Sequence, residues 1–173
     1  YAYIIALKAN GQTLQALNLI DEILTKFPKN LILNITKSEI LLSGQQLARA
    51  EQSIEKVLTI SPGNYPASII QSKILSAKKE IIKAEEVLRD LLIKKNRDPS
   101  LWMQLSEVQR AGKNIVGYHL SRGEYYLLIG DFENALNQFQ FALRLSGNSF
   151  QASETIITKI KFAQERLGNK RGF

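Results

Sequence analysis

The sequence contains no cysteine and only one histidine, His119, among its 173 residues. Without cysteine the chain has no disulfide, no thiolate zinc site and no thiol nucleophile, and one histidine excludes any site that needs two imidazole ligands. No glycine-rich phosphate loop, serine-nucleophile turn or paired-carboxylate motif is visible either. We therefore expect no cofactor, no bound metal and no catalytic residue in this chain, and we expect His119 at a polar or half-buried helix position.

Long apolar runs are also missing, because lysine, glutamate, glutamine or asparagine interrupts each one before the roughly 18 residues that a membrane span requires. No secretion signal is visible, although a processed chain would have lost one. The only methionine is Met103, and Tyr1 already lies in an apolar helical pattern. We therefore expect this chain to be a piece of a longer protein.

Acidic residues are fewer than basic ones, with 16 against 23, which gives a net charge of +7. The excess is largest in residues 61–115, where acidic residues are interleaved with the basic ones at helical spacing, as on a solvated helix face. The alternative is a basic patch that binds nucleic acid, an acidic protein or an anionic membrane surface. Only Tyr65 and Trp102 supply aromatic rings in this stretch, which argues against nucleic-acid binding by base stacking.

The most informative feature is an internal repeat with a period of 34 residues. Ala16, Ala50 and Ala84 are 34 residues apart, and a leucine recurs eight residues after each alanine and nine residues before it. Proline follows the first two alanines by twelve residues, at Pro28 and Pro62. Several positions that recur together at one period indicate a repeat architecture.

Apolar residues within each unit recur at helical spacing, as in Ile20, Ile23, Leu24 and Phe27, and strand-like alternation is not sustained. The pattern therefore predicts an all-α chain. The expected turn glycines are Gly11, Gly44, Gly112 and Gly130, and the expected N-caps are Asn30, Asn64 and Asp98, with Pro99 at a first helical position. The expected helices cover about 1–10, 13–27, 31–43, 46–60, 65–77, 80–96, 99–111, 115–129, 131–146 and 149–168.

The last unit has small and aromatic residues at fixed offsets. These are Gly123, Tyr126, Gly130, Ala135, Phe139, Ala142 and Leu143. A 34-residue pair of helices with this pattern resembles the tetratricopeptide repeat. The small residues Gly123 and Ala135 are expected to let two antiparallel helices approach closely, while Tyr126 and Phe139 fill the space between neighbouring pairs. The resemblance implies a right-handed superhelix of helix pairs that binds proteins or peptides.

We expect one repeat domain over residues 1–173. Its parts are repeats at about 1–29, 30–63 and 64–98, an irregular helix at 99–112, a repeat at 115–147 and a capping helix at 149–168. Residues 99–112 begin like the first helix of a repeat, but the segment that starts at Ile115 already opens the last repeat. The capping helix should place Ile156, Ile157, Ile160 and Phe162 on its apolar side.

The stretch from Pro99 to Leu167 has a more specific pattern. It includes Leu101-Trp102, Gly112-Lys-Asn and Glu124-Tyr-Tyr-Leu-Leu-x-Gly-Asp-Phe-Glu-Asn-Ala135. This stretch, together with residues 17–30, resembles the C-terminal repeat domain of bacterial zinc metallopeptidases of the beta-barrel assembly-enhancing protease type. The family carries its His-Glu-x-x-His motif in a preceding domain, and nothing in this chain matches that motif.

By this resemblance, the chain is the non-catalytic docking domain of a periplasmic peptidase involved in outer-membrane protein quality control. Its partners would be outer-membrane assembly factors or unfolded outer-membrane proteins, together with the peptidase domain of the same chain. The alternative is a free-standing tetratricopeptide scaffold in secretion or pilus assembly.

The repeat register predicts the binding surface. The first helices of stacked pairs line the concave side, where extended peptides are held. Equivalent positions there mix apolar and charged residues, which suits an extended, partly apolar peptide better than a small molecule. In the alternative interpretation, the isoleucines and leucines only complete the core between first helices. The predicted groove residues are Ile5, Lys8, Ile35, Glu39, Leu42, Ile69, Lys73, Ser76, Leu120, Glu124 and Leu127.

Overall fold

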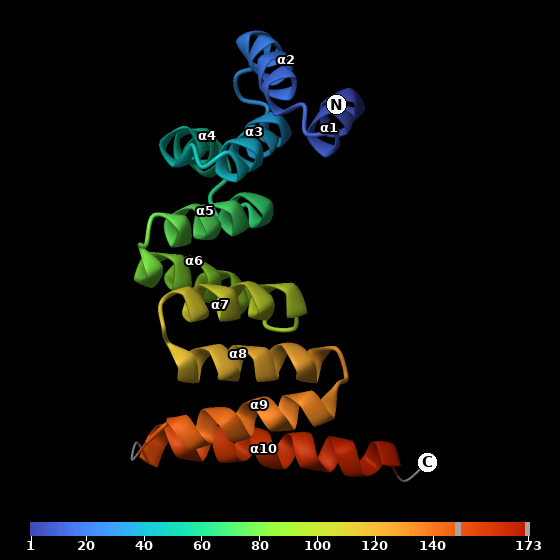
Figure 1. The fold of residues 1–173 in the computed structure, drawn as a ribbon, viewed down its shortest axis with the longest axis vertical. Helices are drawn as coiled ribbons and strands as arrows, with labels where there is room; N and C mark the ends of the chain where they lie inside the picture. Colours follow the sequence, from blue (N-terminus) through green and yellow to red (C-terminus); the bar gives the residue numbers. More distant parts are fainter. Residues whose placement is uncertain (148–149, 172–173) are drawn as a thin grey trace. The chain divides into compact units, whose positions relative to one another are not determined.

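The computed structural model describes residues 1–147 and 150–171, and these ranges contain ten helices and no strand (Figure 1). The prediction of an all-α chain is therefore confirmed. No helix within these ranges combines the length and the apolar character that crossing a membrane requires. The helices are α1 (Ala2–Ala9), α2 (Thr13–Lys26), α3 (Leu31–Ser43), α4 (Leu47–Ile60), α5 (Tyr65–Ala77), α6 (Ile81–Lys94), α7 (Pro99–Ala111), α8 (Ile115–Leu128), α9 (Phe132–Leu145) and α10 (Phe150–Arg171).

Three of the helices begin at the N-caps that the sequence predicts. The side-chain oxygens of Asn30, Asn64 and Asp98 accept hydrogen bonds from backbone N–H groups one turn into α3, α5 and α7, at 3.0, 3.2 and 2.9 Å. Pro99 is the first residue of α7, as expected. These bonds satisfy N–H groups that have no partner within the helix, and each such cap typically contributes about 1 kcal/mol.

The turns between helices use glycine in two ways. Gly130, between α8 and α9, has a φ of 77°, a left-handed conformation that glycine adopts readily and residues with a side chain rarely adopt. Gly112 instead ends α7 with a φ of −83°, and the following Lys113 takes the left-handed conformation at 60°. A Cβ atom on Gly112 would lie 2.5 Å from Cγ2 of Ile81, so glycine is needed there for close packing against α6.

Contacts divide the chain into two compact units, residues 1–80 and 81–173. In the first unit, α3 packs against α2, α4 and α5, and α1 packs against α2. The repeat residues Ala16 and Ala50 are fully buried together with Ile20 and Ile54, so the recurring alanines mark the places where helices approach closely.

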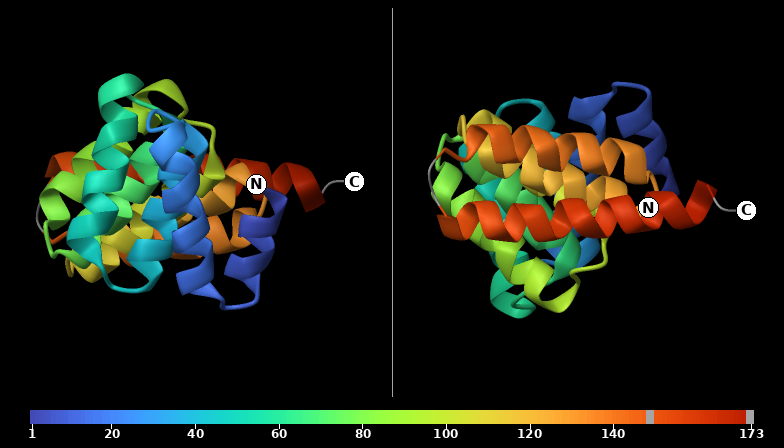
Figure 2. Two further views of the ribbon diagram at one scale, coloured as in Figure 1. Left: turned by 90° about the horizontal axis from the view of Figure 1, so that it is seen from above. Right: turned by 90° about the horizontal axis from the view of Figure 1, so that it is seen from below.

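In the second unit, α7 packs on α6 and α8, while α9 packs on α8 and α10. The view from below in Figure 2 shows α9 and α10 side by side. Phe139 and Ala135 of α9 are fully buried in the core of this unit, next to Ile156 and Ala163 of α10. The core roles predicted for Ala135 and Phe139 are confirmed.

The helix starts continue the 34-residue period through the segment predicted to be irregular. Helices α3, α5 and α7 begin at residues 31, 65 and 99, and α4, α6 and α8 begin at residues 47, 81 and 115. Helix α8 packs against both α7 and α9, so it has a partner on either side. The division into an irregular helix at 99–112 and a repeat at 115–147 stays a prediction.

The last helix differs from the prediction in its length and its buried face. It continues to Arg171, three residues beyond the expected end, while residue 149 lies outside the described residues. Ile156 and Ala163 are buried, but Phe162 is 44% exposed, so its assignment to the apolar side was wrong. Ile156 and Ala163 are two helical turns apart and share a face, whereas Phe162 is rotated by about 100° from Ala163.

Candidate functional site

Eight of the predicted groove residues lie in the first unit, on α1, α3 and α5. Ile5 is 39% exposed and Lys73 is exposed. The remaining six are half-buried: Lys8, Ile35, Glu39, Leu42, Ile69 and Ser76. The first-helix positions of this unit thus combine apolar and charged side chains that are partly accessible to a ligand.

An ion pair joins two of these positions across neighbouring first helices. Lys8 Nζ on α1 lies 2.6 Å from Glu39 Oε2 on α3. A partly exposed pair of this kind contributes about 0 to 1 kcal/mol to stability. Because of this pair, Lys8 already has a carboxylate partner within the chain. Lys73, in contrast, forms no ion pair with any residue that the structure describes.

Two apolar members of the predicted groove contribute to the core of the first unit. Ile35 and Leu42 of α3 pack against the buried cluster that contains Ile40 and Leu41. This is the arrangement expected if these residues complete the core between helices. Ile5, with 39% of its surface exposed, offers more apolar surface to a ligand than a core residue does.

The other three predicted residues, Leu120, Glu124 and Leu127, lie on α8 in the second unit. Leu120 and Leu127 pack against the cluster around Phe139. The carboxylate of Glu124 accepts a hydrogen bond from Nζ of Lys159, which ties α8 to α10.

A pocket of about 540 Å³ lies beside these α8 residues. Two of the predicted groove residues, Glu124 and Leu127, belong to its wall. The other lining residues come from the α6–α7 connection and from α8, α9 and α10: Arg97, Leu128, Phe132, Phe162 and Arg166. The pocket therefore has aromatic and aliphatic side chains together with two guanidinium groups.

Those five lining residues were not among the predicted groove residues. One available signal was the spacing of Phe162 and Arg166, which places them one turn apart on the same face of a helix. In the structure, the Arg166 guanidinium carbon lies 5.1 Å from the centroid of the Phe162 ring. Arg97 had no such signal, because it lies in a connection between helices and reaches the pocket only through the packing of the unit.

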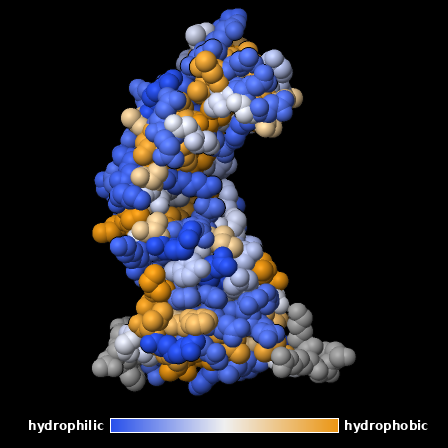
Figure 3. Space-filling view, in the orientation of Figure 1, coloured by the Kyte–Doolittle hydropathy of each residue, from blue (hydrophilic) through white to orange (hydrophobic). Residues whose placement is uncertain are grey.

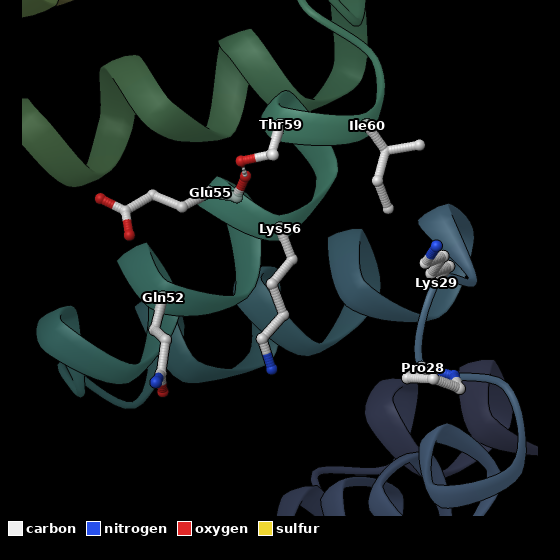
Figure 4. A pocket seen from close by; sticks show the side chains of 7 residues that line it. All are labelled: Pro28, Lys29, Gln52, Glu55, Lys56, Thr59 and Ile60. Carbon is white, nitrogen blue, oxygen red and sulfur yellow. Dashed lines mark hydrogen bonds between the residues drawn. The ribbon is translucent and has the colours of Figure 1, made fainter.

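A second hollow, of about 440 Å³, lies in the first unit between the α2–α3 connection and α4 (Figure 4). It is lined by Pro28, Lys29, Gln52, Glu55, Lys56, Thr59 and Ile60, all of which are exposed. Figure 4 shows the Glu55 carboxylate extending away from Pro28 and Lys29. Because its lining is exposed and carries both signs of charge, this hollow is a weaker binding candidate than the pocket of the second unit.

A third hollow, of about 360 Å³, lies beside α2 and α3 and is mainly apolar. Its lining includes Tyr1, Phe27 and Ile32, which are 62%, 61% and 59% exposed. In the surface view of Figure 3, hydrophobic residues are interspersed with hydrophilic ones over the coloured part of the face shown.

The pKa of Lys78 is shifted by its neighbours. Hydrogen bonds to Glu51, at 2.8 and 2.9 Å, and to Glu80 raise the pKa of Lys78 above its ordinary value. The Lys78 ammonium group thereby connects α4 to the end of α5. This cluster joins two helices of the first unit and lies outside the three hollows described above.

His119 is half-buried on α8, as predicted. Its Nδ1 lies 2.8 Å from Oε1 of Gln138, and its ring stacks on Phe141 with 5.3 Å between centroids. Among the described residues, no group of three or more histidines, cysteines, aspartates or glutamates is arranged to hold a metal ion. His119 therefore has a structural environment made of a glutamine and an aromatic ring.

No protein-family model and no curated protein matches the sequence. Solved structures do match. A tetratricopeptide repeat protein from Parabacteroides merdae is 18% identical with a TM-score of 0.59, and the match covers 93% of this chain and 68% of that one. MamA from Desulfovibrio magneticus is 14% identical with a TM-score of 0.67, covering 97% and 93%. A TPR protein from Thermus thermophilus is 17% identical with a TM-score of 0.57, covering 92% and 96%. The chain thus has the tetratricopeptide-type fold that its sequence predicts.

Proposed function

We propose that this chain is a protein- or peptide-binding module made of tetratricopeptide-type helix pairs. The observation that carries the proposal is the set of partly accessible apolar and charged side chains on the first helices, such as Ile5, Glu39 and Lys73. Such a surface can bury an apolar side chain while its charged groups bind polar groups of an extended chain. The likeness to solved tetratricopeptide structures supports the proposal.

We further propose that the module docks substrates or partners for a periplasmic zinc metallopeptidase of outer-membrane protein quality control. The support is the sequence resemblance of residues 99–167 and 17–30 to the repeat domain of that family. The partners would be outer-membrane assembly factors, unfolded outer-membrane proteins and the peptidase domain. The sequence encoded upstream of Tyr1 tests this proposal: a His-Glu-x-x-His motif there supports it, while a short upstream segment without that motif favours a free-standing scaffold.

A capture experiment tests the binding function. The immobilised chain is incubated with unfolded outer-membrane proteins and with assembly factors, and the Lys73→Glu variant is compared with wild type. We expect reduced capture, because the substitution replaces the positive charge of Lys73, one of the predicted groove residues on the first helices, by a negative charge. We expect little change in thermal stability, since exposed sites usually change stability by under about 0.5 kcal/mol.

The matched control is Lys56→Glu, which reverses an exposed lysine on the second helix of a pair. Lys8 is a poorer test residue on its own or combined with Lys73, because its reversal would place two carboxylates together at Glu39. Undiminished capture by folded Lys73→Glu would contradict the groove assignment. Loss of capture by Lys56→Glu alone would move the site to the face of α4 shown in Figure 4.

A further inference from the structure

We propose that the pocket of the second unit binds a peptide segment in which a bulky apolar side chain is flanked by carboxylates. The pocket lies between α8, α10 and the α6–α7 connection. This inference rests on the proposed function, since it assumes a peptide-binding module, and it adds a binding site in the second unit and the chemistry of its ligand.

The apolar part of the ligand is indicated by the walls of the pocket. Leu127, Leu128, Phe132 and Phe162 contribute aliphatic and aromatic surface, and Leu128 and Phe162 remain 36% and 44% exposed. A bulky side chain inserted among them would remove apolar surface from water on both partners. The volume of about 540 Å³ also lies within the range of about 300 to 1,000 Å³ that is usual for ligand pockets.

The acidic part is indicated by the charges on the pocket lining. Glu124 is already paired with Lys159, so its negative charge is balanced within the protein. Arg97 and Arg166 form no ion pair with any residue in the described ranges. The pocket therefore carries two guanidinium groups with no carboxylate partner within the described part of the chain, and a ligand can supply such a carboxylate.

Arginine suits this role because its planar guanidinium group can bind both oxygens of one carboxylate. The Arg166 guanidinium lies over the Phe162 ring, which restricts where the cation can point and keeps it beside the apolar wall. An apolar side chain next to Phe162 and a carboxylate next to Arg166 would therefore be neighbours in the ligand. A peptide rich in lysine would be repelled at the same place.

The walls are held together before any ligand arrives. Helix α8 packs on α9, α9 packs on α10, and the ion pair between Glu124 and Lys159 links α8 directly to α10. A site whose walls are already positioned loses less conformational entropy when it binds. The conformational entropy lost on binding then comes from the ligand and the two arginine side chains.

Fluorescence anisotropy with the full chain tests the inference. The probe is a short labelled peptide with Leu-Phe at its centre and two glutamates on each side. Three matched peptides replace the glutamates by glutamine, the glutamates by lysine, or Leu-Phe by Ser-Ser. We expect each replacement to weaken binding by roughly tenfold or more, and we expect the binding of the parent peptide to weaken as salt is raised.

Protein variants then locate the site. Arg97→Gln combined with Arg166→Gln should weaken binding of the parent peptide roughly tenfold and reduce its salt dependence. Phe162→Ala should weaken binding while leaving the salt dependence in place. The control is Lys29→Gln combined with Lys56→Gln, which removes two exposed cations from the hollow of the first unit and should leave affinity within about twofold. Circular dichroism melting verifies that each variant folds.

Peptide binding that persists in the double arginine variant, or equal affinity for the glutamate and lysine peptides, would overturn this inference and leave the proposed function standing. Stronger binding of a single-stranded oligonucleotide than of the acidic peptide would also overturn it. If the wild-type chain binds neither these peptides nor any member of a random peptide array, the proposed function fails and the inference fails with it.

Discussion

Replacing Gly123 with alanine should force α8 away from α9. A Cβ atom at this position would lie 2.6 and 2.7 Å from Cδ1 and Cζ of Phe139, and closer still to its Cε1. Real carbon atoms do not approach so closely, so the ring or a helix must move. Phe139 is fully buried in the core of the second unit, so its ring cannot move into solvent to relieve the clash.

Two opposing effects set the magnitude. Alanine is a better helix former than glycine, which alone would stabilise α8 by about 1 kcal/mol. Overpacking a filled core costs typically about 1 to 3 kcal/mol, and a clash with a buried ring belongs at the upper end of that range. We therefore expect a net loss of about 1 to 2 kcal/mol in the free energy of unfolding of the second unit.

Urea denaturation followed by tryptophan fluorescence is the appropriate assay. Trp102 is the only tryptophan, and it lies on α7 in the second unit, so its signal reports on the unit that contains the substitution. The matched control is Gly168→Ala on α10, where an added Cβ would meet nothing within 4 Å. That variant should keep or raise stability, by up to about 1 kcal/mol.

A double variant isolates the clash. Phe139→Leu alone should be destabilising, but it should rescue part of the loss caused by Gly123→Ala, because the smaller side chain vacates the space that the new methyl group needs. If Gly123→Ala is as stable as wild type, or if the two substitutions are simply additive, the close approach of α8 and α9 at Gly123 is refuted.

Three further predictions follow from the same structure. Ala50→Leu should lower the unfolding free energy by about 1 to 3 kcal/mol in urea denaturation, because Ala50 is fully buried, and an unchanged midpoint would contradict the repeat alignment. Lys78→Met should be less stable than wild type at neutral pH, because the variant loses the hydrogen bonds of the charged Lys78 to Glu51 and Glu80, which also raise the pKa of Lys78. This advantage of wild type is fully present below the unfolded-state pKa of about 10.4 and should shrink as the pH rises through the higher folded-state pKa in alkaline melts, so a constant difference would contradict it. Finally, with His119 as its only imidazole, the chain should bind no stoichiometric zinc and cleave no casein, and one tightly held zinc per chain in metal analysis would show the opposite.

The secondary structure was predictable because its signals are local. Asn30 and Asp98 cap helices through atoms a few residues away, and the 34-residue recurrence of Ala16 and Ala50 reflects contacts that repeat in each pair. The role of Gly123 was predictable as well, since only glycine leaves room for Phe139 at that crossing. Features that depend on neighbours in sequence or on the repeat period are therefore accessible to sequence analysis.

The pocket was only partly predictable because it depends on packing between helices. Glu124 and Leu127 were predicted as groove residues on the first helix of the last repeat, although α8 begins in phase with the second helices α4 and α6. Arg97 reaches the same pocket from a connection between helices. Phe162 was assigned to the apolar side of the last helix, but it follows a direction about 100° from that of buried Ala163 and lines the pocket instead. The ion pair of Lys8 with Glu39 likewise joins residues 31 positions apart, beyond any local signal.

The central claim, that this chain binds peptides and holds acidic ones in the pocket of the second unit, is tested most directly by hydrogen–deuterium exchange with and without bound acidic peptide. We expect protection to increase in α8 and α10 around Glu124 and Phe162, with the face of α4 that carries Lys56 unchanged. Protection confined to that face of α4, or no change anywhere at saturating peptide, would contradict the claim.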